Sequence, residues 1–216
     1  MTLFEFLNYI GVFVFAATGA LSASRRQLDI IGFIFLANIT GIGGGTMRDL
    51  LLGTPVFWVE RPIYLLPGTL AAIIVYFTAH RVESRYRLLL WLDAIGMAAY
   101  TVMGAAKGLD FGFGAPVAIV TGIFTATLGG ILRDMVAGEP SVLMRREIYI
   151  TAAFAGACLY VILAWFGINP IITALTSGLL AFIVRGGALY FGWTLPVYKS
   201  RPGRTAEELL RDRIVR

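Results

Sequence analysis

The chain has 216 residues, of which 58% are hydrophobic and only 14% are charged, and its formal net charge is +5. A soluble domain carries about 25% charged residues, so this composition, with a mean hydropathy of +0.79, excludes an ordinary soluble fold. The apolar runs are continuous rather than alternating, and several approach the roughly 20 residues that a membrane helix needs. We therefore expect an all-α polytopic membrane protein.

Seven transmembrane helices are predicted. In chain order they cover residues 4–23, 28–52, 63–78, 88–106, 114–136, 148–166 and 171–190. Basic residues gather in the loops on one side of this arrangement and in the polar tail, residues 192–216, whereas the opposite loops hold little beyond Arg61 and Lys107. By the positive-inside rule the N-terminus lies outside and the C-terminus in the cytoplasm. Because the basic residues border apolar runs, nucleic acid is not expected as a partner.

A segment in the second helix recurs in the fifth at a spacing of 85 residues, and the same spacing relates positions elsewhere. The matched pairs are Gly44 and Gly129, Gly45 and Gly130, Arg48 and Arg133, Asp49 and Asp134, Gly53 and Gly138, Pro55 and Pro140, Asn8 and Asp93, and Tyr64 and Tyr149. Residues 1–85 and 86–168 are therefore predicted to be two copies of a three-helix unit. Three crossings per copy place the second copy upside down, a 3+3 inverted repeat typical of transport proteins. A seventh helix, residues 169–191, lies outside the repeat.

The glycines of the repeated segment allow two interpretations. They are Gly41, Gly43, Gly44 and Gly45 in the second helix and Gly129 and Gly130 in the fifth. The helices could loosen there near the membrane centre, where freed backbone groups, together with hydroxyls such as that of Thr46, would hold an ion. Alternatively, the small-xxx-small pattern lets helices pack closely. The charged pair that follows both clusters favours a functional broken helix.

The charged pairs Arg48-Asp49 and Arg133-Asp134 are costly in a membrane, since an arginine at the helix centre costs about 2.5–3.5 kcal/mol on insertion scales. Neighbouring residues on a helix point about 100° apart. We therefore predict pairing across the repeats, Arg48 with Asp134 and Arg133 with Asp49. The alternative is that both arginines extend to the nearest membrane surface.

Three further charged residues lie in or near apolar runs. Asp93 is expected either to attract cations at the inner mouth of a pathway or to cap a neighbouring helix. Lys107 is predicted to be an interface anchor, and Arg185 to bind lipid headgroups or to extend to the interface. The single Cys158 and the single His80 give no Cys/His cluster. Neither a metal site nor a cofactor is expected.

The pattern Gly-x-Gly-Gly-Gly-Thr-x-Arg-Asp at Gly41–Asp49, with its weaker copy at Ala126–Asp134, resembles the prokaryotic trimeric intracellular cation (TRIC) channel family, also catalogued as putative bacterial glycine transporters. The resemblance implies a homotrimer in the inner membrane of a bacterium or archaeon. Each protomer would have a pore between kinked helices two and five, passing monovalent cations, chiefly potassium, with sodium as a second permeant ion. Arg48, Asp49, Arg133 and Asp134 would be the pore-side charges, and membrane lipids the surrounding partners. Leu128 and Ala126 stand where the first copy has Gly43 and Gly41, so the fifth helix is expected to bend less.

Three classes of function follow from these observations. A potassium-permeable channel is favoured, provided that the arginines are neutralised or act as a gate. The rival is a carrier for a small zwitterion such as glycine, because inverted repeats with broken helices are common in carriers. An enzyme acting on lipid headgroups is the third class, and the absence of any Ser/His or Cys/His arrangement argues against it.

Overall fold

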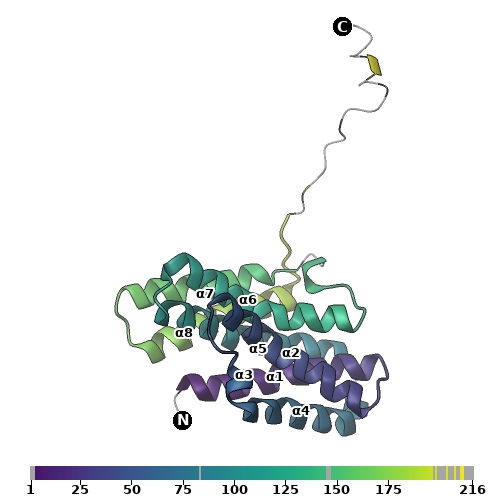
Figure 1. Ribbon diagram of the computed structural model, residues 1–216. Helices are drawn as coiled ribbons and strands as arrows, with labels where there is room; N and C mark the ends of the chain where they lie inside the picture. Colours follow the sequence, from purple (N-terminus) through teal and green to yellow (C-terminus); the bar gives the residue numbers. More distant parts are fainter. Residues whose placement is uncertain are drawn as a thin grey trace.

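The computed structural model describes residues 3–82, 84–144 and 147–196, and the single residues 198, 203, 207, 210 and 211. Within them the fold is helical. The α-helices are α1 (Leu3–Arg25), α2 (Ile30–Leu51), α3 (Phe57–Glu60), α4 (Leu65–Thr78), α5 (Arg85–Asp110), α6 (Gly114–Val136), α7 (Ile150–Trp165) and α8 (Pro170–Phe191) (Figure 1). Three 3₁₀ turns cover Pro62–Tyr64, Ala79–Arg81 and Val142–Met144.

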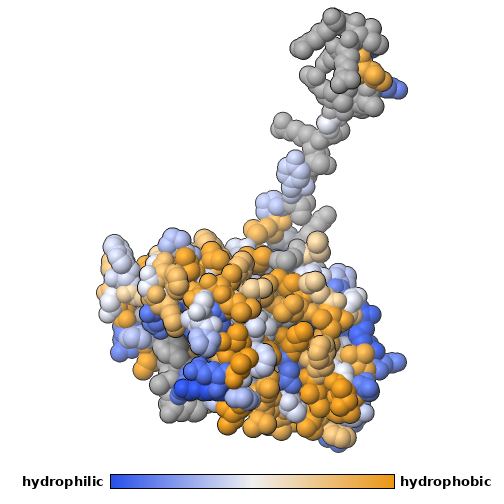
Figure 2. Space-filling view, viewed as in Figure 1, coloured by the Kyte–Doolittle hydropathy of each residue, from blue (hydrophilic) through white to orange (hydrophobic). Residues whose placement is uncertain are grey.

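The predicted membrane architecture is confirmed. Among the described residues six helical segments are long and apolar enough to cross a membrane, and α7 is a shorter apolar helix. Its 16 residues span about 24 Å at 1.5 Å per residue, and it completes the set of seven. In Figure 2 apolar side chains cover the middle of the visible face, and the most hydrophilic ones gather towards its two ends. This is the surface expected of a protein surrounded by lipid.

Two details differ from the sequence-based prediction. The loop after α2 contains the short helix α3, and α5 is longer than predicted at both ends. The side chain of Ser84 caps α5 by accepting a hydrogen bond from the backbone N–H of Arg87 over 3.3 Å, which starts the helix before the apolar run begins. N-cap residues of this kind satisfy backbone donors that the helix leaves free.

The inverted repeat appears in the packing of the helices. In each unit the first helix lies against the second and third: α1 against α2 and α4, and α5 against α6 and α7. The units meet through α1 with α5 and α2 with α6, while α8 packs on α5 and α7. In Figure 1, α4 lies at one edge of the bundle and α7 and α8 at the opposite side. The rings of Phe15 and Tyr100, which are 85 residues apart, stack at 5.1 Å between the units.

The glycine clusters do not break their helices, so the broken-helix interpretation is wrong for this conformation. Both α2 and α6 are continuous α-helices through Gly41, Gly43, Gly44 and Gly45 and through Gly129 and Gly130. Continuous helices keep backbone groups bonded, which matters where no water can replace the bonds.

Close packing explains two of these glycines directly. A Cβ added at Gly44 would overlap the carbonyl oxygen of Thr125, and one added at Gly129 would overlap that of Thr40. The two contacts are equivalent under the repeat, so α2 and α6 cross with their backbones touching.

Candidate functional site: an arginine cluster in each repeat

Arg48 and Asp49 pair with each other, which corrects the prediction of cross-repeat pairing. The Nε of Arg48 donates to Oδ1 of Asp49 over 2.8 Å, and both side chains are almost completely buried. The other oxygen of Asp49 accepts the backbone N–H of Phe57 over 2.9 Å. The 100° argument failed because a long arginine side chain curls back beside its neighbour. Through its bond to the N–H of Phe57, Asp49 also holds the loop that follows α2.

Lys107 is the residue that sequence reasoning missed in this cluster. Its Nζ lies 2.7 Å from Oδ1 of Asp49, so it bridges α5 to α2 rather than serving as the predicted interface anchor. Two cations therefore share one carboxylate. The only available signal was that Lys107 is one of just two lysines in the chain and closes an apolar run.

Arg133 forms the second cluster, again without the predicted cross-repeat partner. It donates from Nε to Oδ1 of Asp134 over 2.9 Å, and its Nη1 reaches Oδ1 of Asp93 at 2.7 Å and the hydroxyl of Thr18 at 2.9 Å. The second oxygen of Asp134 accepts the backbone N–H of Val142 over 3.0 Å. Asp93 is thus an ion-pair partner, and neither of its two predicted roles describes this contact. Thr18 was not singled out by the sequence.

The two clusters follow one plan. Phe57 and Val142, whose N–H groups the aspartates hold, are 85 residues apart. The chain turns after each helix at a glycine with positive φ, Gly53 at 64° and Gly138 at 63°. Such a backbone conformation carries no steric cost for glycine, which explains why the motif continues to that residue in both copies.

The clusters differ in their access to solvent. Arg48 lines a polar cavity of about 200 Å³, whereas Arg133 is 1% exposed and closely surrounded by its partners. The cavity is lined by Glu5, Asn8, Arg48, Phe57, Tyr64, Met103, Ala106, Lys107 and Asp110. Where the second repeat has Asp93, the first has Asn8. The repeat therefore supplies a second carboxylate, besides the adjacent aspartate, to Arg133 but not to Arg48.

Between the clusters the bundle is filled. Val12, Phe15 and Met97 are completely buried, and the buried hydroxyl of Tyr100 donates to the carbonyl oxygen of Gly41 over 2.8 Å. The hydroxyl of Thr46 accepts a hydrogen bond from the indole of Trp58 in the α2–α4 connection. In this conformation apolar side chains therefore separate the two clusters.

Arg185 was predicted to reach the lipid interface, and this prediction is wrong. Its side chain is completely buried, with Nη2 2.6 Å from Oε2 of Glu147 and Nη1 3.3 Å from the carbonyl of Ile148. The guanidinium also lies 5.0 Å from the ring centre of Tyr149. These contacts attach α8 to the segment that enters α7.

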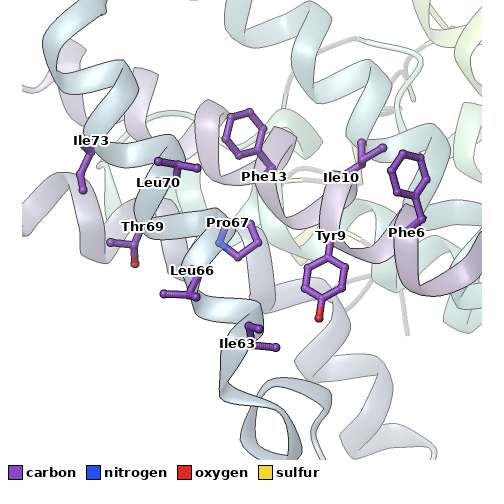
Figure 3. Close-up of a pocket in the computed structure, with 10 residues that line it drawn as sticks. All are labelled: Phe6, Tyr9, Ile10, Phe13, Ile63, Leu66, Pro67, Thr69, Leu70 and Ile73. Atoms are coloured by element: carbon purple, nitrogen blue, oxygen red, sulfur yellow. The ribbon is translucent and has the colours of Figure 1, made fainter. Parts of the chain in front are cut away.

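A larger hollow on the outer surface has a different character. The groove of about 750 Å³ between α1 and α4 is lined by apolar side chains such as Phe13, Ile63 and Leu70 (Figure 3). It offers no charged group to an ion and lies on the apolar outside of the bundle. The polar cavity at Arg48, although smaller, is the better candidate site. Among the described residues no cluster of three His, Cys, Asp or Glu side chains could hold a metal ion.

The fold and these clusters define a polytopic membrane protein built as an inverted repeat with one arginine cluster per copy. A family model described as "Glycine transporter" matches residues 5–80 and again 90–165. A UPF0126 membrane protein of Vibrio cholerae is 35% identical over 91% of this chain and 83% of its own length. The UPF0126 inner membrane protein YadS of Escherichia coli K12 is 33% identical over 89% of this chain and 94% of its own.

Solved structures agree with these matches. A TRIC trimeric intracellular cation channel orthologue from Rhodobacter sphaeroides is 48% identical, covers 89% of this chain and all of its own, and superimposes with a TM-score of 0.87. A second TRIC cation channel is 30% identical over 94% of this chain, with a TM-score of 0.82. The chain belongs to this family of UPF0126 membrane proteins and prokaryotic TRIC channels.

Proposed function

We propose that this protein is a channel for monovalent cations, chiefly potassium, in a prokaryotic inner membrane. The observation that carries the proposal is its 48% identity, over the full length of that chain, to a TRIC cation channel orthologue. We further propose that it assembles as a homotrimer, as the word trimeric in the name of that relative suggests. Each protomer would contain one pathway. The N-terminus would lie outside and the C-terminal tail in the cytoplasm.

The pathway proposed here runs between α2 and α6, flanked by α1 and α5, with an arginine cluster near each end. Arginines would ordinarily repel a permeant cation. Here Arg133 has two carboxylate partners, Asp93 and Asp134, so the cluster formed by these three side chains carries a net negative charge. At the other end Arg48 and Lys107 share Asp49, and Glu5 and Asp110 line the same cavity. This neutralisation removes the main physical objection to a cation pathway.

The conformation described above is then a closed one. Backbone contact between α2 and α6 at Gly44 and Gly129 and the stacked rings of Phe15 and Tyr100 obstruct the proposed pathway. Opening would require α2 and α6 to separate at the glycine contacts. The O–H groups of Thr40 and Thr125 donate to carbonyls one turn earlier in their own helices. In the open state the oxygens of these hydroxyls would face a partly dehydrated ion.

A carrier for a small amino acid is the second candidate. The observation that favours it is the polar cavity at Arg48, which holds both basic and acidic side chains and lies at one end only of the filled bundle. A carrier would expose such a site alternately to the two sides of the membrane.

Flux into liposomes separates the two candidates. Purified protein is reconstituted with a potassium gradient, the membrane potential is set by an ionophore, and potassium flux is compared with uptake of labelled glycine. The channel proposal predicts fast potassium flux that does not require glycine. Saturable glycine uptake without potassium flux would overturn it in favour of the carrier.

A further inference from the structure

Two hollows follow the seam along which α8 packs on α5. The first, called here the polar hollow, has a volume of about 680 Å³ and is lined by residues 84–91 at the start of α5 and residues 189–190 at the end of α8. The second, the apolar hollow, has a volume of about 430 Å³ and is lined by apolar residues within 95–102 of α5 and 174–182 of α8. Both lie away from the two arginine clusters.

The polar hollow has the chemistry of a membrane surface. It lies where one helix begins and the other ends, and its lining includes Tyr86, Trp91 and Tyr190, residue types that are enriched at the boundary between lipid and water. The one charged side chain in its described lining is that of Arg87, which is exposed. The hydroxyl of Ser84 lies on the same lining and accepts the backbone N–H of Arg87, so its proton can still be donated. A guanidinium and a hydroxyl donor suit a phosphate group.

The two hollows are neighbours on the seam. Trp91 lines the polar hollow and Phe182 the apolar one, and the centres of their rings are 6.3 Å apart. From Leu90 to Val102, α5 rises about 18 Å at 1.5 Å per residue. One leaflet contributes about 15 Å to a hydrocarbon core about 30 Å thick. The apolar hollow therefore extends from the polar one to about the middle of the bilayer.

We propose that the α5–α8 seam binds one anionic glycerophospholipid. Its phosphate lies in the polar hollow at Arg87 and Ser84, and one of its acyl chains follows the apolar hollow. No acidic side chain is among the described residues of the polar lining, so the ammonium of a zwitterionic headgroup finds no partner there and a headgroup with net negative charge is favoured. The proposal is independent of the proposed function, because the lipid binds on the outside of the bundle whether the chain conducts cations or carries a solute.

Trp91 is a built-in reporter for this site, because bromine atoms on an acyl chain quench the fluorescence of a tryptophan that they approach. Purified full-length protein is reconstituted into vesicles of phosphatidylglycerol and phosphatidylcholine with identical chains, and one lipid at a time is brominated. The signal of Trp91 is the difference between the wild type and Trp91→Phe. We expect phosphatidylglycerol to be preferred about fivefold, the effect of one basic residue at a membrane surface.

Two results of this measurement would overturn the proposal. Equal quenching by the two brominated lipids would show that the seam does not select an anionic headgroup. Absence of quenching by either would show that no acyl chain reaches the seam, as when another copy of the chain covers it. Glycerol 3-phosphate, which has the phosphate but no chains, should not displace the lipid when added in excess, and displacement would exclude a contribution from the apolar hollow.

Arg87→Gln tests the headgroup contact. We expect this variant to lower the preference for phosphatidylglycerol over phosphatidylcholine to about one. Arg81→Gln is the matched control, because it removes the same charge from an exposed arginine in the preceding 3₁₀ turn, outside the polar lining, and it should retain the preference. Equal losses in the two variants would show that net charge alone attracts the lipid, and an undiminished preference in Arg87→Gln would refute the assignment of the phosphate to this arginine.

The acyl chain has its own test. Ala99 is partly exposed and lines the apolar hollow, so Ala99→Phe should fill it and lower the quenching of Trp91 by both brominated lipids at least twofold. Val120→Phe is the control, because Val120 is exposed on α6 and lies outside this lining. Unchanged quenching in Ala99→Phe would contradict the proposed path of the chain. Because Arg87 is exposed, its replacement preserves the fold, and the headgroup test stands even if Ala99→Phe does not fold.

Discussion

Arg133 and Asp93 form an ion pair of 2.7 Å between α6 and α5, and each side chain is 1% exposed. The pair is surrounded by protein rather than water, so its two charges depend on each other. Removing one partner of a buried pair leaves an uncompensated charge, which typically costs about 3–5 kcal/mol. The contact therefore ties the first two helices of the second repeat together.

The first prediction concerns this pair. Asp93→Asn should lower the free energy of unfolding by about 3 kcal/mol. This is the low end of the range for a broken buried pair, because Asp134 still neutralises Arg133. Arg133→Gln combined with Asp93→Asn should be more stable than the sum of the single changes implies, because the two effects are coupled. Thermal unfolding in detergent measures both. Strict additivity of the two changes would show that Arg133 and Asp93 are not coupled. Coupling of Arg133 with Asp49 instead would restore the cross-repeat pairing rejected above.

The second prediction concerns the crossing of α2 and α6. Gly44→Ala and Gly129→Ala each place a Cβ against a backbone carbonyl, and overpacking of this kind costs about 1–3 kcal/mol. Gly178→Ala is the matched control, because the atom nearest to a Cβ added at Gly178 is a methyl carbon of Val102 at 3.5 Å. It should be neutral or slightly stabilising, since alanine is favoured over glycine in a helix. Equal melting temperatures for Gly44→Ala and Gly178→Ala would show that the helices do not cross in direct contact.

The third prediction concerns the hydroxyl of Tyr100. Tyr100→Phe keeps the stack on Phe15 but removes the hydrogen bond to the Gly41 carbonyl that ties α5 to α2. A hydrogen bond of this kind contributes about 1 kcal/mol, which corresponds to about a fivefold shift in an equilibrium. Under the proposed function, resting potassium flux should rise by about that factor. Tyr190→Phe, on the exposed side of α8, is the control and should leave flux unchanged. Unchanged flux in Tyr100→Phe would show that the hydrogen bond from Tyr100 to Gly41 does not stabilise the closed state.

The fourth prediction concerns Lys107 at the polar cavity. Lys107→Gln removes one of the two cations that share Asp49, so the local potential becomes more favourable for a cation. Potassium flux at low salt should rise, and the difference from wild type should shrink at high salt because ions screen exposed charges. Flux measured at several ionic strengths checks this. A salt-independent change would point to altered packing rather than to the charge.

The helices and the repeat were predictable from the sequence because lipid imposes simple requirements. A span needs a minimum length of apolar residues, and the spacing of 85 residues is preserved in the motif and beyond it. The division at residues 85 and 168 remains a prediction, although the family model matches each half separately. The short helix α3 was missed because turn residues alone do not reveal a single helical turn.

The details of the charged site were harder to predict. Helix geometry gives the direction of Cα–Cβ bonds but not the path of a long arginine side chain, so the neighbours Arg48 and Asp49 were wrongly kept apart. Lys107 joins Asp49 from a helix of the other repeat, and no local pattern records such a contact. The glycine clusters correctly indicated a local structural constraint. That constraint is the close approach of the α2 and α6 backbones, not a break in either helix.

Single-channel recording shows whether the protein conducts potassium through a pore. Purified protein is incorporated into a planar bilayer with potassium as the permeant ion, and the current is followed at fixed voltage. We expect discrete current steps whose reversal potential follows the potassium gradient and whose open time increases in Tyr100→Phe. Electrically silent bilayers from protein that takes up labelled glycine into liposomes would contradict it.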